Sequence, residues 1–293
     1  MKTKKRKIII TTSVILACAL IASISYIVYN TVVVPSEHIE KYEQIQNDYK
    51  DGKIKFQKPS NLSVNQGDDS DMSNDSQEEN EGEISSNNPN VLEPNNGNNN
   101  DGSNGGEPYT YTYEYEDRMI GWMSIPGTSV NYPVMYYEGD NSFYLTHDYT
   151  NRYDVYGSLF LDGDQQIGSQ NMTIYGHNNN NTYYKSMFTE VANYQYSNFF
   201  NNHPTVYFDI GDDSTEYEVV GAIIINMNKK TYNYTRSNFG NGDDFIDFVT
   251  TLYDNCSVKK DGVTFSENDS VITLSTCTNR NNSDRVVVLC KKV

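Results

Sequence analysis

Val271-Ile-Thr-Leu-Ser-Thr-Cys277 and Arg285-Val-Val-Val-Leu289 stand close together near the carboxyl end of the chain, and each run is typical of a β-strand. Seven polar residues separate the two runs, which predicts a hairpin with Cys277 and Arg285 side by side at its end. A cation beside a cysteine favours the thiolate, which is the nucleophilic form. It also stabilises negative charge that develops on a carbonyl under attack. Cys277 and Arg285 are therefore candidate catalytic residues.

The region around this hairpin is rich in short apolar runs that are separated by Gly, Pro, Asn and Asp clusters. Two helical patterns interrupt the runs, a short one near Tyr184–Asn193 and a stronger one at Asp243–Tyr253. Many short strands and few helices predict a mostly β fold, a barrel or a sandwich. We expect strands at Ile120–Ile125, Val130–Val134, Ser158–Leu161, Met172–Tyr175, Thr205–Ile210, Glu216–Asn226, Val271–Thr276 and Val286–Lys291.

A nucleophilic cysteine needs a partner for proton transfer, and histidine is the usual one. His177 directly follows the predicted strand 171–176 and precedes four asparagines, a position suited to lining a cleft. His147 also has the character of a strand-end residue, so spacing alone leaves both open. We expect His203 to be a solvated loop residue and His38 to lie beside the membrane, remote from any core.

Two arginines compete for the place beside the sulfur. Arg280 would sit on a mobile turn, whereas Arg285 is held by the strand that it begins, and rigid placement suits a catalytic charge. The alternative for Arg285 is a solubilising residue on an edge strand. Strand alternation places Arg285, Val287 and Leu289 on one face and Val286, Val288 and Cys290 on the other.

The amino terminus has the composition of a membrane anchor. Residues 2–7 carry five positive charges, and residues 8–34 carry no charge of either sign. This uncharged stretch is longer than the roughly 20 apolar residues that a helix needs to span a bilayer. A cleaved signal peptide would have a shorter apolar stretch, and the run continues well past Cys18, where a lipoprotein would be cleaved. The basic flank predicts a cytoplasmic amino terminus and an extracellular domain.

Three cysteines follow the anchor, namely Cys256, Cys277 and Cys290, so at least one thiol has no partner within the chain. A bridge between Cys256 and Cys290 is possible. We expect both instead to be small buried apolar residues.

The formal charge of −17 is concentrated between the anchor and the β-rich region. Residues 59–108 contain eleven acidic residues, thirteen asparagines and neither Lys nor Arg, a composition that cannot bury a core and predicts a disordered tether. The expected organisation is a basic cytoplasmic tail (1–7), a transmembrane anchor (8–34), a juxtamembrane helix (35–58), a disordered acidic linker (59–108) and a catalytic domain (109–293).

Several other chemistries lack support in the sequence. Zinc-binding spacings and glycine-rich phosphate loops with lysine do not occur, and the acidic balance disfavours nucleic acid. Asp162, Asp164, Asp212 and Asp213 are suggestive of calcium, but they stand in turns, where aspartate is common for its own reasons. We therefore expect neither a metal nor a cofactor.

From about Ile120 to its carboxyl end the chain resembles the sortases, the cysteine transpeptidases of Gram-positive cell surfaces. The helix predicted at Asp243–Tyr253 resembles class B sortases in particular, and the resemblance favours His177 over His147. It rests on Gly121-Trp-Met-Ser-Ile-Pro-Gly127, Tyr132-Pro-Val134, Gly157-Ser-Leu-Phe-Leu-Asp162, Ile174-Tyr-Gly-His177 and Thr273-Leu-Ser-Thr-Cys277 with Arg285 after it.

The resemblance implies a closed barrel of eight strands with the active site at the end of a groove. Sortases cleave a sorting signal of the Leu-Pro-x-Thr-Gly or Asn-Pro-x-Thr-x type in secreted proteins. Cys277 would attack the threonine carbonyl to form a thioester, which an amine of a cell-wall precursor or a pilin lysine would resolve. His177 would protonate the leaving amine and deprotonate the incoming one, and Arg285 would stabilise the oxyanion or hold the substrate backbone.

Class B relatives typically begin with helices packed on the barrel, whereas here Tyr111–Met119 leaves room for only a short one. Two other functions remain open from the residues. The same three side chains would serve a cysteine endopeptidase that uses water as the acceptor. A non-catalytic wall-binding module would keep Cys277 merely buried.

Overall fold

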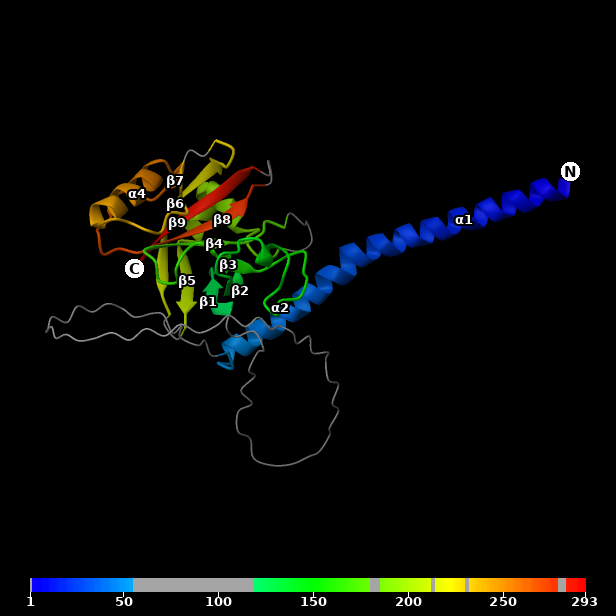
Figure 1. The fold of residues 1–293 in the computed structure, drawn as a ribbon, viewed down its shortest axis with the longest axis horizontal. Helices are drawn as coiled ribbons and strands as arrows, with labels where there is room; N and C mark the ends of the chain where they lie inside the picture. The colour runs from blue at the N-terminus through cyan, green and yellow to red at the C-terminus, as the bar shows by residue number, and fades with distance from the viewer. Residues whose placement is uncertain (1, 55–117, 180–184, 212–213, 230–231, 279–282) are drawn as a thin grey trace, which may run out of the picture. The chain divides into compact units, whose positions relative to one another are not determined.

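The computed structural model of the protein describes residues 2–54, 118–179, 185–211, 214–229, 232–278 and 283–293. The predicted linker 59–108 and Arg280 lie outside the described residues. Eight strands form a closed barrel in the order β5-β1-β2-β3-β4-β8-β9-β6, which β5 closes by pairing with β6 (Figure 1). A short ninth strand, β7, is added to β6. The strands are β1 Met119–Ser124, β2 Asn131–Tyr136, β3 Leu159–Leu161, β4 Asn171–Tyr175, β5 Thr205–Ile210, β6 Glu216–Asn226, β7 Val258–Lys259, β8 Val271–Cys277 and β9 Asp284–Lys292.

Most barrel neighbours are antiparallel, but β2–β3 and β4–β8 are parallel. Parallel neighbours need a long crossover connection, and the one from β4 to β8 holds β5, β6, β7 and the helix α4 (Gly242–Asp254). The barrel predicted from the sequence is confirmed. The two-residue strand β7 is too short to leave a pattern in the sequence.

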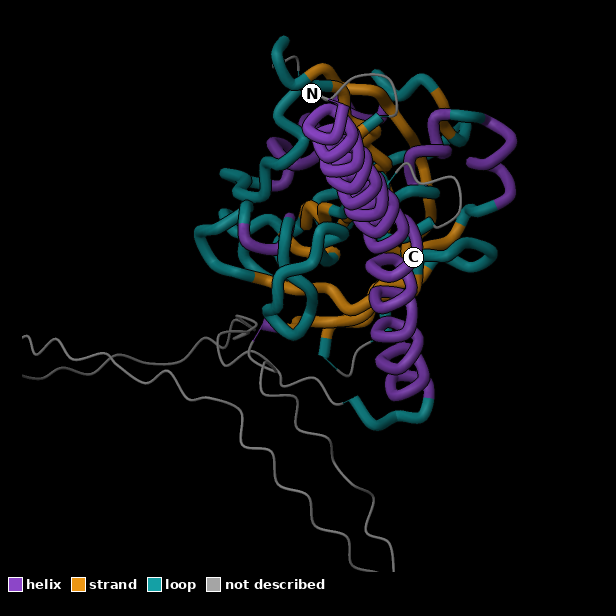
Figure 2. Tube along the Cα trace, turned by 90° about the vertical axis from the view of Figure 1, so that its right-hand side faces the viewer, coloured by secondary structure: helices purple, strands orange, loops and turns teal. Residues whose placement is uncertain are grey.

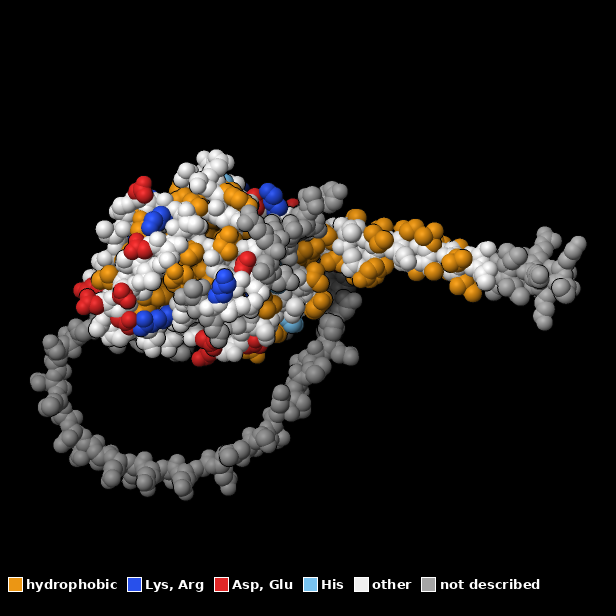
Figure 3. Space-filling view, turned by 90° about the horizontal axis from the view of Figure 1, so that it is seen from above, with side chains coloured by type: hydrophobic (Ala, Val, Ile, Leu, Met, Phe, Trp, Pro, Cys, Tyr) orange, Lys and Arg blue, Asp and Glu red, His pale blue; other side chains and the backbone are white. Residues whose placement is uncertain are grey.

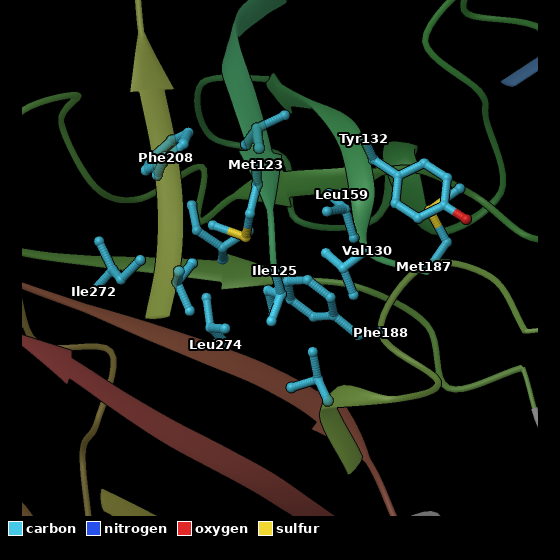
Figure 4. Packing of buried hydrophobic residues seen from close by; sticks show 14 of the residues in the cluster. Met123, Ile125, Val130, Tyr132, Leu159, Met187, Phe188, Phe208, Ile272 and Leu274 are labelled. Atoms are coloured by element: carbon cyan, nitrogen blue, oxygen red, sulfur yellow. The ribbon is translucent and has the colours of Figure 1, made fainter. Parts of the chain in front are cut away.

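The interior of the barrel is filled by apolar side chains from strands on every side. Met123 of β1, Phe208 of β5, and Ile272 and Leu274 of β8 are all fully buried there (Figure 4). Burial of each such side chain stabilises the fold by about 1.5–3 kcal/mol. Alternation along β8 and β9 therefore fixes which residues face the interior and which face outward.

A second apolar cluster lies on the outer face of β6 and β9, where α4 covers it (Figure 1). Asn241 caps this helix by accepting a hydrogen bond from the Asp244 N–H at 2.9 Å, which satisfies one of the free amides of the first turn. The helix predicted at Asp243–Tyr253 is confirmed. The shorter helical pattern at Tyr184–Asn193 was misplaced, because the helical turns η4 (Val191–Gln195) and α3 (Ser197–Asn202) begin later.

A continuous helical stretch begins the chain, with α1 (Lys2–Val28), a π-helical turn η1 (Tyr29–Val33) and α2 (Val34–Lys50) in succession (Figure 2). Its part from Thr12 onward is long and apolar enough to cross a membrane, and hydrophobic side chains are visible along it (Figure 3). The helix predicted after the anchor thus exists as α2.

The expectation that His38 lies remote from any core is wrong. His38 is buried, and its Nδ1–H donates to Asp154 Oδ2 at 2.7 Å. Tyr42 and Ile45, one and two turns further along α2, belong to the barrel's apolar cluster. Helical spacing correctly predicts an apolar face, but it does not tell what that face contacts. Here α2 packs on the barrel, although it precedes the predicted linker.

Candidate active site

The hairpin of β8 and β9 places Cys277 directly opposite Arg285 as cross-strand partners. Just beyond the pair, the Thr278 N–H donates to the Asp284 carbonyl at 3.0 Å and extends the ladder toward the turn. Both Cys277 and Arg285 are half-buried. The structure therefore brings a thiol and a guanidinium together at the end of the hairpin, as the sequence predicts.

His177 lies beside the same end of β8, because β4 and β8 run parallel and Tyr175 is the register partner of Ser275. The two chains stay together beyond the strands. Thr276 Oγ1 donates to the Gly176 carbonyl at 2.8 Å, and Asn178 Nδ2 donates to the Cys277 carbonyl at 2.9 Å. The structure thus brings His177, Cys277 and Arg285 to one end of three adjacent strands.

The imidazole of His177 is oriented by a backbone group from another part of the chain. Its Nε2 lies 2.7 Å from the carbonyl oxygen of Leu145, the last residue of the turn η3 (Phe143–Leu145). A carbonyl only accepts, so Nε2 carries the proton and donates it. In the neutral ring this leaves Nδ1 as the acceptor, and Nδ1 is the atom that can exchange a proton with a reacting group.

Cys277 and Arg285 lie outside the apolar interior, on the outer face of the sheet. Residues of β9 alternate as predicted, since Val287 and Leu289 join the outer cluster and Val286, Val288 and Cys290 join the interior. Arg285 lies two residues before Val287 on β9 and therefore faces outward with it, as does its cross-strand partner Cys277. Both side chains are partly exposed at this end of the outer face.

Tyr234, from the segment between β6 and α4, covers this outer face. Its hydroxyl lies 3.0 Å from Ser275 Oγ, one outer position before Cys277. Burial raises the pKa of Tyr234, the hydrogen bond to Ser275 and the charge of Arg285 lower it, and Cys277 contributes a smaller raising effect. The hydrogen bond to Ser275 places the phenol on the outer face of β8, one outer position before Cys277.

The covering segment is fixed to the strands by buried polar side chains. Asn171 Nδ2 donates to the carbonyls of Tyr234 and Arg236 at 2.9 and 2.8 Å, and Gln165 Nε2 donates to the Thr235 carbonyl at 2.6 Å. Because Asn171 and Gln165 are buried, these bonds cannot be replaced by water without cost. Sequence reasoning missed Tyr234 and its supports, since a tyrosine in a polar loop has no distinctive pattern.

The remaining histidines have other surroundings. The His147 ring stacks on Phe143 with centroids 4.0 Å apart, and its Nδ1–H donates to the Phe143 carbonyl at 2.8 Å. His203 is half-buried against Phe199 and donates to that residue's carbonyl at 2.9 Å, so the expectation of a solvated loop residue is wrong. The short helix α3 ends at His203 and holds the ring in place.

Cys256 and Cys290 are both buried and unbridged. They belong to different clusters, Cys290 inside the barrel and Cys256 under α4, as expected for small apolar residues. Burial raises the pKa of Cys256 to about 12 and raises that of Cys290 as well. Close packing is evident at Gly221, where an added Cβ would lie 2.6 Å from the Cys256 sulfur.

Among the residues that the structure describes, no group of three or more His, Cys, Asp or Glu side chains could hold a metal ion. Asp162, one of the aspartates singled out in the sequence, already accepts hydrogen bonds from Asn141 at 2.9 Å and from the Tyr175 hydroxyl at 2.7 Å. Asp212 and Asp213 lie outside the described residues.

A family model described as the sortase domain matches residues 123–293, more than half of the chain. The chain belongs to the sortase family, whose members are cysteine transpeptidases. The curated relatives that it resembles are named sortase B. One from Listeria monocytogenes is 34% identical over 161 residues, and one from Staphylococcus aureus is 29% identical over 179 residues. The matched region spans 62% of the Listeria protein and 69% of the Staphylococcus protein, and 54% and 59% of this chain.

Solved sortase B structures share the fold. A mutant form of Clostridium perfringens sortase B superposes with a TM-score of 0.56 at 26% identity, covering 60% of this chain and 82% of that chain. A Staphylococcus aureus sortase B–substrate complex gives 0.55 at 27% identity, with 61% and 82% covered. Sortase B from Listeria monocytogenes gives 0.53 at 29% identity, with 61% and 96% covered.

Proposed function

We propose that the protein is a membrane-anchored sortase of the B type, which cleaves a sorting signal after its threonine and transfers the acyl group to an amine. The observation that carries this proposal is the cross-strand pairing of Cys277 with Arg285 beside His177, within the region that matches the family. Catalytic nucleophile, proton carrier and cation then meet at one end of β4, β8 and β9.

Acylation begins when Nδ1 of the neutral His177 ring takes the proton of the Cys277 thiol, and the resulting thiolate sulfur forms a bond to the threonine carbonyl carbon of the sorting signal. The carbonyl π bond opens, and its electron pair becomes an oxyanion that the Arg285 guanidinium stabilises. As the oxyanion collapses, the carbon–nitrogen bond breaks and the leaving amine takes the proton from His177 Nδ1. A thioester on Cys277 remains.

Deacylation reverses the roles. The incoming amine gives a proton to His177 Nδ1 as its nitrogen attacks the thioester carbonyl. The carbon–sulfur bond then breaks, and the released thiolate takes the proton back from Nδ1. Throughout both halves the Leu145 carbonyl holds Nε2–H, so that proton transfer occurs at one nitrogen of the ring only.

The proposed substrates are secreted proteins with a carboxyl-terminal signal of the Leu-Pro-x-Thr-Gly or Asn-Pro-x-Thr-x type. The acceptor is an amine of a peptidoglycan precursor or of a pilin lysine. A relative from Staphylococcus aureus has been solved in complex with a substrate, which supports peptide recognition by this fold.

We further propose that α1 anchors the protein in the cell membrane with the basic tail 1–7 in the cytoplasm and the barrel outside. The apolar length of the helix and the five positive charges before it support this orientation. The acidic segment 59–108 remains a predicted linker, since it lies outside the described residues. A membrane-impermeant thiol reagent added to intact cells should label Cys277 if the orientation is right.

Transpeptidation can be tested with the full chain in detergent micelles, a panel of sorting peptides and a short oligoglycine acceptor. Mass spectrometry should detect a ligated product and a thioester on Cys277. Both should vanish in Cys277→Ala and persist in Cys290→Ala, the matched control. If no peptide of the panel yields a product or an adduct on Cys277, the proposal is wrong.

The same experiment separates transfer from hydrolysis, because the two reactions share the thioester. A cysteine hydrolase gives the free acid with or without the amine, whereas a transpeptidase gives the amide when the amine is present. A wall-binding module gives neither product, and its Cys277 resists alkylation.

A further inference from the structure

The contacts of α2 extend beyond the barrel core to the segment 143–158, which is the later part of the connection from β2 to β3. His38 Nδ1–H donates to Asp154 Oδ2 at 2.7 Å, and Lys41 forms an ion pair with Asp148. Asp148 is fully buried, and Asp154 is 8% exposed. Buried carboxylates are costly unless they are paired, so α2 supplies partners that this segment requires.

In each of the two carboxylates, one oxygen contacts a side chain of α2 and the other accepts hydrogen bonds from the backbone of 143–158. Asp148 Oδ2 binds Lys41, while its Oδ1 accepts from the N–H groups of Thr150 and Arg152 at 2.8 and 3.0 Å. Asp154 Oδ2 binds His38, while its Oδ1 accepts from the Tyr156 N–H at 2.9 Å. Burial alone would raise the pKa of Asp154, but the hydrogen bond and charge of His38, the Tyr156 N–H bond and the charge of Lys41 together lower it. Both side chains therefore connect α2 to the backbone of 143–158.

The same segment contacts the candidate active site through the backbone around Leu145. Three backbone carbonyls between 144 and 147 accept bonds within the segment, namely Tyr144 from Ser158 N–H, Thr146 from Asp154 N–H and His147 from Ser158 Oγ. The fourth carbonyl, that of Leu145, accepts instead from His177 Nε2. Leu145 is thus held between residues that the segment fixes, and the position of its oxygen depends on how the segment is folded.

We propose that α2 is a positioning element of the active site, in which His38 and Lys41 hold the 143–158 segment so that the Leu145 carbonyl orients His177. The inference rests on the proposed function of His177 as the proton carrier. With α2 docked, the ring is kept as the Nε2–H tautomer with Nδ1 available. With α2 released, the acceptor that selects this tautomer is no longer fixed.

The kinetic test uses the full chain in detergent micelles, with a sorting peptide and an oligoglycine acceptor. Lys41→Met keeps the aliphatic stem and removes the charge beside Asp148, and His38→Leu removes the donor to Asp154. Each should lower kcat on the order of tenfold, because proton transfer needs an oriented ring, and should leave KM within about twofold. His38→Asn should restore most of kcat, since the asparagine amide can donate to Asp154 in place of Nδ1.

The matched control is Tyr49→Phe, at the other end of the same helix. The Tyr49 hydroxyl donates to Asp209 on β5, and its ring stacks on Trp122 of β1 with centroids 4.2 Å apart. This change removes a polar contact from α2 to an aspartate, whereas Lys41→Met removes the ion pairs with Asp148 and Asp154. Tyr49 contacts β1 and β5 rather than the 143–158 segment, so kcat should stay within about twofold of wild type.

A direct readout is nitrogen-15 NMR of histidine-labelled protein, with the His177 signals assigned by His177→Gln. Wild type should show one proton on Nε2, and Lys41→Met should show a mixture of tautomers. If kcat and tautomer are unchanged in Lys41→Met and His38→Leu, or if Tyr49→Phe lowers kcat equally, the inference is wrong. If the wild-type protein is inactive, and the Nε2–H tautomer is present in it but lost in Lys41→Met and His38→Leu, the proposed function is wrong. The positioning role of α2 is then still supported.

Discussion

The β8–β9 hairpin carries a cysteine near each end, and the two have opposite surroundings. Cys277 is half-buried on the outer face and lies opposite Arg285, whereas Cys290 is fully buried in the barrel interior opposite Ile272. Both belong to regular strands, so backbone geometry does not distinguish them. The difference arises from strand parity and from the cross-strand neighbour, which together decide whether a thiol meets water and a cation or only methyl groups. Placement, rather than residue type, makes one of them a candidate nucleophile.

The largest effect is expected from truncating each cysteine in turn. Cys277→Ala should reduce transpeptidation by roughly 10,000-fold or more, because no other group can form the thioester. Cys290→Ala should keep kcat and KM within about twofold. Steady-state assays of purified variants measure both, and substantial turnover in Cys277→Ala would break the comparison.

Alkylation should show the same contrast without any substrate. Burial raises the pKa of Cys256 to about 12, so its thiolate share at neutral pH is about 1,000-fold below that of a solvated cysteine. Its labelling should therefore rise steadily with pH and level off only near the raised pKa. Peptide mapping after brief iodoacetamide treatment at pH 7 should find Cys277 modified and Cys256 and Cys290 intact. Equal labelling of all three would contradict the burial argument.

Arg285 should matter because of its charge and its shape. Arg285→Ala should lower kcat about 100-fold, since an oxyanion would lose its cation. Arg285→Lys should recover only part of this loss, because a single ammonium lacks the planar array of donors that a guanidinium offers. Comparing kcat for the two variants sharpens the contrast between the hairpin ends. A loss confined to KM would assign Arg285 to substrate binding alone.

The smallest effect concerns stability at the buried end of the hairpin. Cys290→Ala removes a sulfur from a fully buried position and leaves a small cavity, at a cost of about 1–2 kcal/mol in the free energy of unfolding. Cys277→Ala, at a half-buried strand end, should cost less. Chemical denaturation of both variants measures the difference, and the reverse ranking would be evidence against it.

Most of the barrel could be predicted from local patterns. The runs Thr205–Ile210 and Glu216–Asn226 match β5 and β6 at both ends, because alternating apolar residues bounded by turn residues leave little freedom. The alternation of β9 also gave the correct faces for Val286 through Cys290. Such features depend on neighbouring residues, which is why a sequence reveals them.

What could not be predicted depends on contacts between distant segments. The spacing of Ile39, Tyr42 and Ile45 indicates a helix, but only the folded chain shows that His38 lies against Asp154. The acceptor for His177 is a backbone carbonyl 32 residues earlier, and carbonyls have no signature in a sequence. Tyr234 reaches Ser275 from a loop whose composition matches many surface loops.

The parallel pairing of β4 with β8 joins residues that are a hundred positions apart, as with Tyr175 and Ser275. The chain between them supplies the barrel strands β5 and β6 as well as the covering segment and α4, and it then returns as β8 beside β4. Because the register of β4 with β8 sets where His177 lies relative to Cys277, a change in the length of the loops between these strands would leave that placement unaltered.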